Sequence, residues 1–546
     1  MIFIIYLFKY IKVKLFILMK QFIINNVFKI INYSGYDAWF VGSCVRNKLL
    51  GLPFNNFDIC TNCPLEAIMV IFDKIVNIFK NTYYNIYIVN LIIKDNKRTE
   101  HIDITILCPL DLTKTDEYNS LIKINPLSNY YNDVLLVKDS LRRDFTINTL
   151  YEDINGKIID PTGLGFSDLR NNILRFVGED YKTKLINDPF IMFRFIRFLS
   201  TKNLTSFESL ESIKQISENL DYNKISNEHK LSELIKIISG KNWMNSYFYN
   251  YFEASGICKF LGFDKIIESL KSCNQTYEFH LEGSVWKNKK TQELKNGEEI
   301  DNFTDWTPIK QGNVFDHTIL TIKNICKLLG NDPDKHKRFI LNMSAFLHEI
   351  GKSKFKEIYG EKNKKYKINN LEIEETNPII YEHDFISKYL VYDFCKSLKI
   401  NIDDCKLIKY LVDNYMKILQ LNSFKSPSQI FKFVKQKNFE YLLILAQADE
   451  MASIPINKLK STIRQIMEHR IVLYLNGEFT LTEISIKNLT KMNLPKCVLT
   501  KKDLIDIGIK NNELIEKMLD KTLDIQINEG ITNKKILLNK IKNEVN

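Results

Sequence analysis

The pattern of apolar residues changes once along this chain, and that change constrains the fold more than any other feature. Between residues 37 and 180, short runs rich in β-branched and aromatic residues alternate with turns. From Asp188 onward, apolar residues recur mainly at helical spacing, and glycine and proline are sparse. Alternating runs bounded by turns predict strands, and spacings of three and four predict helices. We therefore expect an α/β head followed by a long, multi-part all-α body.

The length and charge of the chain limit the classes of protein it can be. A chain of 546 residues, 45% of them hydrophobic, is too long for one compact core and has enough apolar material for several units. Its formal net charge of +11 suits a polyanionic partner such as RNA, but the lysine excess is equally compatible with an ordinary solvated surface. Charge alone leaves the partner open.

Cysteine usage bears on the compartment. The chain has ten scattered cysteines, and only Cys60 and Cys63 form a Cys-x-x-Cys pair. A structural zinc site needs a second pair of Cys or His ligands, which the sequence does not supply beside this one. A reducing compartment is the simpler interpretation, because disulfide frameworks belong to oxidising ones. We expect a cytoplasmic protein.

The N-terminal segment leaves an alternative to that location. The first 36 residues contain five lysines, no acidic residue and many large apolar side chains. This composition fits either a targeting segment, such as a mitochondrial one, or an amphipathic surface helix. Lys9, Lys12 and Lys14 interrupt the apolar run, so we expect no membrane insertion. Residues 1–18 are compatible with a dispensable extension.

A strand, a glycine turn and a helix open the head. Residues 38–41 read as a buried strand, Gly42 and Ser43 as a tight turn, and residues 45–50 as a short helix that ends at Gly51. This order places backbone N–H groups and a hydroxyl at a helix N-terminus, where phosphate groups are well accommodated. A glycine turn alone is weak evidence for a nucleotide site.

Carboxylates follow this turn at two places. Asp58 lies just beyond the predicted helix, two residues after Asn56, and Asp103 lies within the run 101–106. In that run isoleucines alternate with Asp103, so a strand would bury the isoleucines and turn Asp103 to the opposite face. A third charged cluster, from Asp139 to Asn148, contains two adjacent arginines; a surface ion-pair cluster is the alternative interpretation there.

In their order along the chain, these segments resemble the template-independent nucleotidyltransferases of the tRNA CCA-adding and bacterial poly(A) polymerase family, within the polymerase-β-like superfamily. Residues 40–59 are similar to the family's opening motif, and residues 139–148 to its Arg-Arg-Asp segment. Residues 159–169 resemble a flexible element after the palm, where glycines permit hinge motion. The resemblance covers about residues 34–540.

The resemblance implies a reaction and a set of site residues. Transfer of CMP or AMP from CTP or ATP to the 3′ end of tRNA or a similar RNA needs an ionised hydroxyl and a neutralised pyrophosphate, which two Mg²⁺ (or Mn²⁺) ions supply. Asp58 and Asp103 would be catalytic and hold the metal. Asn56 would be a weaker ligand, because an amide oxygen carries no charge. The residues implied to bind the nucleotide are Gly42, Ser43, Arg46, Arg142, Arg143, Asp144, Asn148, Asp188, Arg194 and Arg197.

The segment that reads the base in relatives begins where the helical pattern begins. The run 187–189 predicts a helix start with a capping side chain and a proline in the first turn. In the family, an aspartate and an arginine three residues later hydrogen-bond the base edges. This chain keeps Asp188, Arg194 and Arg197, but has Ile191 in place of the first arginine. We expect weaker discrimination between CTP and ATP, since a directional pair is worth about 1–3 kcal/mol. Simple adenylation is then as compatible with the pattern as ordered CCA synthesis.

A second resemblance lies in the body. Residues 312–318 and 345–352, together with a later Ala-Asp pair, resemble the HD domain of some bacterial members. HD domains bind metals through two His and two Asp and hydrolyse phosphoesters. A glutamate replaces one signature aspartate, so a structural helical domain is the favoured interpretation. The candidate HD metal site comprises His317, His348, Glu349 and Asp449.

Two alternatives to the enzyme stay open: a non-catalytic relative that binds RNA or a partner protein through the same basic body, and an HD-type phosphohydrolase. The expected organisation is an N-terminal extension (1–33), a nucleotidyltransferase head (34–180), a helical neck and RNA-binding region (181–285), a linker (286–303), an HD-like helical domain (304–455) and a C-terminal helical tail that resembles a tRNA-binding one (456–546).

Overall fold

The structure is a computed structural model in which the described chain forms two compact units, divided between Lys224 and Ile225. The extension 1–18 and the expected metal ligand Asn56 lie outside the described residues. The structure describes residues 24–54, 57–72, 75–81, 86–95, 98–107, 131–273, 279–280, 285–296, 306–310, 313–352, 366–368, 371–373, 382–419, 426–454, 496–509 and 511–545.

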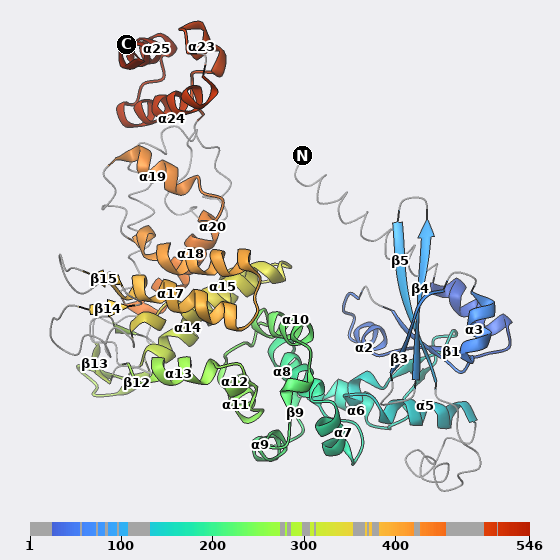
Figure 1. The fold of residues 1–546 in the computed structure, drawn as a ribbon. Helices are drawn as coiled ribbons and strands as arrows, with labels where there is room; N and C mark the ends of the chain where they lie inside the picture. Colours follow the sequence, from blue (N-terminus) through green and yellow to red (C-terminus); the bar gives the residue numbers. More distant parts are fainter. Residues whose placement is uncertain are drawn as a thin grey trace. The chain divides into compact units, whose positions relative to one another are not determined.

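A mixed sheet forms the centre of the first unit (Figure 1). Within the described residues it has seven strands in the order β3-β4-β5-β2-β1-β6-β7, and only the pair β2 and β5 is parallel. The strands are β1 (Ala38–Val41), β2 (Asp58–Thr61), β3 (Ile75–Asn81), β4 (Ile86–Asp95), β5 (Arg98–Ile106), β6 (Tyr151–Glu152) and β7 (Ile158–Ile159).

The alternation predicted for residues 101–106 is confirmed in β5. Ile102, Ile104 and Ile106 are buried, whereas Asp103 is exposed. Successive residues of a strand point to opposite faces, so Asp103 lies on the face opposite to the isoleucines. The isoleucines supply the core contacts of this strand, so the Asp103 side chain is not needed for packing and can take part in a functional site.

Helix α5 (Tyr131–Leu141) packs on the same face that carries Asp58. Trp39 of β1 and Cys60 of β2 join a buried cluster with Val134 of this helix. Cys60 is two residues from Asp58, so the two side chains share a face. The C-terminal end of α5 leads directly into the two adjacent arginines, which brings them to the carboxylate face.

Short helices complete the first unit. The helix predicted at 45–50 is α2 (Ser43–Leu49), which begins two residues earlier than expected. A small parallel pair joins β8 (Ile173–Leu174) to β9 (Thr205–Ser206). The other helices are a helix at 24–33, α3 (Leu65–Ile71), η1 (Thr146–Asn148), α6 (Gly165–Arg170), α7 (Tyr181–Asn187), α8 (Phe190–Thr201), α9 (Leu210–Ser217) and η2 (Tyr222–Lys224).

The second unit is mainly helical, as the spacing of apolar residues predicts (Figure 1). Helices α14, α15, α18 and α20 pack on one another. Its helices are α10 (Asn227–Ile238), α11 (Ser246–Ala254), α12 (Ile257–Phe260), α13 (Phe263–Lys271), α14 (Val314–Leu329), α15 (Lys335–Leu347), α17 (Glu382–Ser397), α18 (Ile402–Leu419), α19 (Pro427–Val434), α20 (Phe439–Glu450), α23 (Lys501–Asp506), α24 (Asn512–Glu529) and α25 (Lys534–Val545).

Part of the predicted linker 286–303 is a sheet instead. Strands β11 (Val285–Asn288), β12 (Leu294–Asn296) and β13 (Trp306–Lys310) pair in the order β12-β11-β13. The charged residues of this segment led to the linker prediction. A small antiparallel sheet can carry such residues on its exposed face, so they do not exclude strands. The remaining short strands are β10 (Phe279–His280), β14 (Tyr366–Ile368), β15 (Leu371–Ile373) and β16 (Ser453–Ile454).

The expected fold class is confirmed: an α/β head precedes a mostly helical body. Among the described helices, none combines the length and the apolar character that crossing a membrane requires.

Candidate active site

A row of polar side chains crosses the head sheet. Asp58 of β2 lies directly opposite Asp103 of the parallel neighbour β5, and Asp103 lies opposite Asn90 of β4. Residues paired in this way point to the same face. The Asn90 amide nitrogen donates to the Asp103 carboxylate over 2.6 Å. The structure therefore brings the two predicted carboxylates together and adds Asn90, which the sequence did not single out.

The glycine turn lies beside this row. Gly42 has a φ of 75°, a conformation that favours glycine, and immediately precedes α2. A Cβ at this position would lie 3.4 Å from the Asp58 carboxylate and 3.8 Å from the Arg143 guanidinium. Ser43 begins α2, which has only seven residues. With so short a helix, we attribute attraction for a phosphate at this turn chiefly to Arg143.

The surroundings of Asp58 suit a cation. Burial raises the pKa of its carboxyl group, Arg143 lowers it, and Asp103 raises it again. Burial and a neighbouring carboxylate both destabilise the ionised form of a carboxyl group, and a bound cation stabilises that form. Carboxylate oxygens are also the ligands that hard divalent cations prefer. The two carboxylates therefore fit the divalent ion that the resemblance implies.

A buried carboxylate fixes the orientation of both adjacent arginines. Asp139 accepts from Arg142 Nε over 2.6 Å and from Arg143 Nε over 2.9 Å. The Tyr151 hydroxyl donates to it over 2.6 Å. Burial would raise the Asp139 pKa, but the two guanidiniums lower it to about 2. Arg142 and Arg143 are thus held by Asp139, whose role the sequence motif did not reveal.

Asp144 joins three elements of the head. Its Oδ1 accepts from the Phe145 N–H over 2.8 Å and from the Asn148 amide over 2.9 Å. Its Oδ2 pairs with Arg194 of α8 over 2.7 Å. Burial raises the pKa of this carboxyl group, but Arg194 and these donors lower it overall. Asp144, which the resemblance implies binds the nucleotide, therefore uses Oδ1 to accept from two protein groups and Oδ2 to form an ion pair with Arg194.

Arg46 extends this network to α2. Its guanidinium donates to the Asn148 side-chain oxygen and lies 5.1 Å from the centre of the Phe198 ring. Burial lowers its pKa to about 10, so it remains charged near neutral pH. Four predicted nucleotide-binding residues therefore form one connected cluster: Arg46, Asp144, Asn148 and Arg194.

The helix expected to read the base separates its residues onto different faces. Asp188 precedes α8 and accepts from the Phe190 N–H over 3.2 Å, but the N-cap residue of the helix is Pro189, which has no capping side chain. Ile191 is only 4% exposed and belongs to the core, whereas the Arg194 side chain is 38% exposed. The Arg197 guanidinium lies 4.5 Å from the centre of the Phe198 ring. Arg194 forms an ion pair with Asp144 in this cluster.

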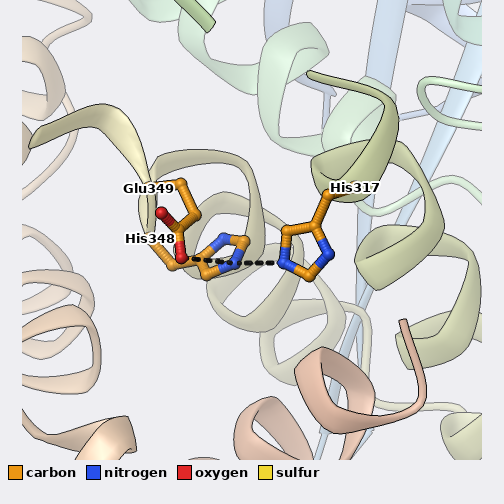
Figure 2. Close-up of side chains that lie close together, drawn as sticks. All are labelled: His317, His348 and Glu349. Carbon is orange, nitrogen blue, oxygen red and sulfur yellow. Dashed lines mark hydrogen bonds and ion pairs between the residues drawn. The ribbon is translucent and has the colours of Figure 1, made fainter. Parts of the chain in front are cut away.

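Three side chains of the candidate HD site, those of His317, His348 and Glu349, lie close together (Figure 2). The Nε2 atom of His317 lies 3.2 Å from that of His348 and 2.8 Å from Asp449 Oδ1, and the last two atoms are 3.4 Å apart. Ligands of one tetrahedral ion with bonds of about 2.1 Å lie about 3.4 Å from one another. His348 Nδ1 donates to the Ala345 carbonyl over 2.6 Å, which leaves Nε2 to act as a ligand. These three groups fit a single metal ion.

Glu349 lies at the edge of this site. Its Oε1 is 3.8 Å from His348 Nε2, and with the two histidines it forms a group that could hold a metal among the described residues. The other carboxylate oxygen, Oε2, pairs with Lys352 over 2.7 Å. Glutamate in place of aspartate therefore keeps a carboxylate near the histidines. The ion pair with Lys352 neutralises part of the negative charge of this carboxylate.

Two regions of the chain match known protein families. Residues 38–175 match the Poly A polymerase head domain, and residues 314–453 match the HD domain. This chain carries a poly A polymerase head domain and an HD domain. The head match contains the residues from Gly42 to Asp144 but not helix α8, and the HD match contains the residues from His317 to Asp449. The two domains that the motifs predict are both matched.

Curated proteins that match part of this chain are CCA-adding enzymes. That of Ligilactobacillus salivarius is 31% identical over 223 residues, which are 39% of this chain and 48% of the relative. That of Geobacillus stearothermophilus is 34% identical over 167 residues, or 30% of this chain and 37% of the relative. The chain thus spans about half the length, or less, of the relatives it matches. A solved structure of a Thermotoga maritima CCA-adding enzyme complexed with tRNA is 15% identical, with a TM-score of 0.48, over 96% of this chain and 94% of that one.

Proposed function

We propose that this chain is a template-independent RNA 3′-end nucleotidyltransferase that adds CMP or AMP from CTP or ATP to tRNA or a similar RNA. The observation that carries the proposal is the position of Asp58 and Asp103, side by side on parallel strands and next to Gly42 and Arg143. The relatives named above are CCA-adding enzymes, which supports this choice over other transfers to a hydroxyl group.

The side chains would share the work of the reaction as follows. Asp58 and Asp103 would hold a divalent cation, for which we propose Mg²⁺ or Mn²⁺; when bound, it would lower the pKa of the RNA hydroxyl and neutralise the pyrophosphate. Arg143 would contact the phosphates above Gly42, because a guanidinium forks two phosphate oxygens. The Arg194 side chain belongs to the Asp144 cluster and is 38% exposed, and we propose that it contacts the base or ribose.

A direct assay separates this proposal from a non-catalytic relative. Labelled ATP and CTP are supplied with tRNA that lacks its CCA end, in Mg²⁺ or Mn²⁺, and Asp58→Ala serves as the control. We expect addition that depends on Asp58, with incomplete discrimination between the two nucleotides because Ile191 offers no donor. Binding of the tRNA without any addition would instead favour the non-catalytic alternative.

The HD site supports a second candidate function, a metal-dependent phosphohydrolase. We propose that His317, His348 and Asp449 hold one divalent ion, with Glu349 as a weaker neighbour. His317→Ala is expected to weaken Mn²⁺ binding at this site by more than about tenfold, measured by calorimetry of the full chain. His336→Ala is the matched control, because His336 is an exposed histidine that pairs with Asp404 on α18. Equal Mn²⁺ affinity in the His317 variant and the wild type would exclude the site, and hydrolysis of bis(p-nitrophenyl) phosphate tests the activity itself.

A further inference from the structure

Lys184 of α7 makes an unusual set of contacts. Its ammonium group donates to three backbone carbonyls: that of Leu141, and those of Arg143 and Val177 over 3.0 Å each. An ammonium group has three N–H donors, so these three acceptors use all of them. The contacts to Leu141 and Arg143 span 43 and 41 residues of sequence, and the contact to Val177 spans 7.

The three carbonyls surround the arginine turn, residues 142–144. Leu141 is the last residue of α5, and its carbonyl is one of those left without a partner inside the helix. A positive charge at a helix C-terminus is favourable, since it opposes the partial negative charge there. Lys184 thus caps α5 at the point where the chain leaves the helix and turns toward the sheet carboxylates.

The same ammonium group fastens the segment that runs beside the arginine turn. The Val177 N–H donates to the Asp144 carbonyl over 3.2 Å, and the Thr146 N–H to the Arg175 carbonyl over 3.0 Å. Lys184 reaches both sides of this pairing, through Arg143 on one side and Val177 on the other. The turn that carries the arginines is therefore held from outside by one side chain.

We propose that Lys184 is a positioning residue for nucleotide binding, which fixes the arginine turn by donating to the carbonyls of Leu141, Arg143 and Val177. This inference rests on the proposed function, since it assigns Arg143 to the phosphates. It goes beyond the motifs, because Lys184 lies outside the Arg-Arg-Asp segment and touches the turn only through the backbone. The alternative is that Lys184 stabilises the head without affecting the turn.

The protonation state of Lys184 gives the proposal a specific pH dependence. Burial lowers its pKa to about 8, although the carboxylates of Asp144 and Asp180, the charged groups that act on it most, raise it. A neutral amine has two N–H donors, so one of the three carbonyls loses its partner as the pH rises through about 8. Nucleotide affinity should therefore fall between about pH 7 and pH 9.5 in the wild type.

The first experiment is hydrogen exchange of the full chain. In Lys184→Met, the amides of Thr146 and Val177 should exchange about tenfold faster, because the carbonyl contacts that hold these two segments are lost. Lys182→Met is the control: Lys182 is exposed on the same helix, and its replacement should leave these amides unchanged. Unchanged exchange in Lys184→Met would overturn the proposal.

The second experiment measures equilibrium binding of ATP and CTP. We expect affinity about tenfold weaker in Lys184→Met, partial recovery in Lys184→Arg, and no decline between pH 7 and 9.5 in Lys184→Arg, because its guanidinium stays charged. If nucleotide affinity changed by the same factor between pH 7 and 9.5 in the wild type and in Lys184→Arg, the role of Lys184 would be contradicted. If the wild type binds neither nucleotide, the proposed function fails, while hydrogen exchange still decides whether Lys184 holds the turn.

Discussion

Replacement of Asp58 by asparagine is expected to slow nucleotide addition by about a thousandfold, which corresponds to about 4 kcal/mol of transition-state stabilisation. Asparagine keeps the shape of the side chain and an oxygen ligand but removes its charge. Asp103→Asn should have an effect of the same order, because Asp103 lies directly opposite Asp58 on the neighbouring strand. The measurement is a single-turnover rate at saturating nucleotide and RNA.

Two controls make this expectation specific. Glu66→Gln removes an exposed carboxylate from α3 of the same unit, and it should leave the rate within about twofold of the wild type. The double variant of Asp58 and Asp103 should be little slower than either single variant, since groups that hold the same ion act as a unit. A rate for Asp58→Asn within tenfold of the wild type would show that this carboxylate does not hold a catalytic ion.

Replacement of Asp139 by asparagine is expected to lower the free energy of unfolding by about 3 kcal/mol at pH 7. Removal of one partner from a buried ion pair costs about 3–5 kcal/mol, because it leaves the other charge uncompensated. In this case Arg142 and Arg143 would both lose their negatively charged partner, and Tyr151 would lose the carboxylate to which it donates. Denaturant unfolding of the head, followed by circular dichroism, measures the change.

The pH dependence of this difference provides a sharper test. The Asp139 pKa is about 2 in the folded protein and 3.8 ordinarily, so the unfolded chain binds more protons between those values. Asp139 therefore contributes about 2 kcal/mol that is present above about pH 4 and is lost as the pH falls toward 2. The stability gap between wild type and Asp139→Asn should shrink over that range. A gap that is constant from pH 5 to pH 2 would rule out an ionised Asp139.

Local sequence patterns correctly predicted individual strands and the glycine turn of the head. The buried run 38–41 and the alternation around Asp103 gave the correct strands, because periodicity and burial are coupled within each segment. The sequence also predicted a glycine turn at residue 42. The structure shows why glycine is required there: the φ of Gly42 is positive, and Asp58 lies close. What these segments could not reveal is the register between strands, which sets Asp58 opposite Asp103.

The remaining features depend on contacts between distant segments. Asn90 and Lys184 were missed because nothing in their local sequence marks them, and only the fold brings them to Asp103 and to the arginine turn. The burial of Ile191 depends on how α8 packs against its neighbours, which helical spacing alone does not determine. Most of strand β11 was assigned to a linker, because the many charged residues of this segment obscured its short apolar pattern.

The central claim is that Asp58 and Asp103 together hold the cation that accompanies the nucleotide. The most direct measurement is electron paramagnetic resonance of Mn²⁺ titrated with a non-hydrolysable ATP analogue, in a His317→Ala background that removes the HD site. We predict Mn²⁺ binding that depends on the analogue and disappears when Asp58 and Asp103 are both replaced by alanine. Retention of the same bound Mn²⁺ in that variant would contradict the account.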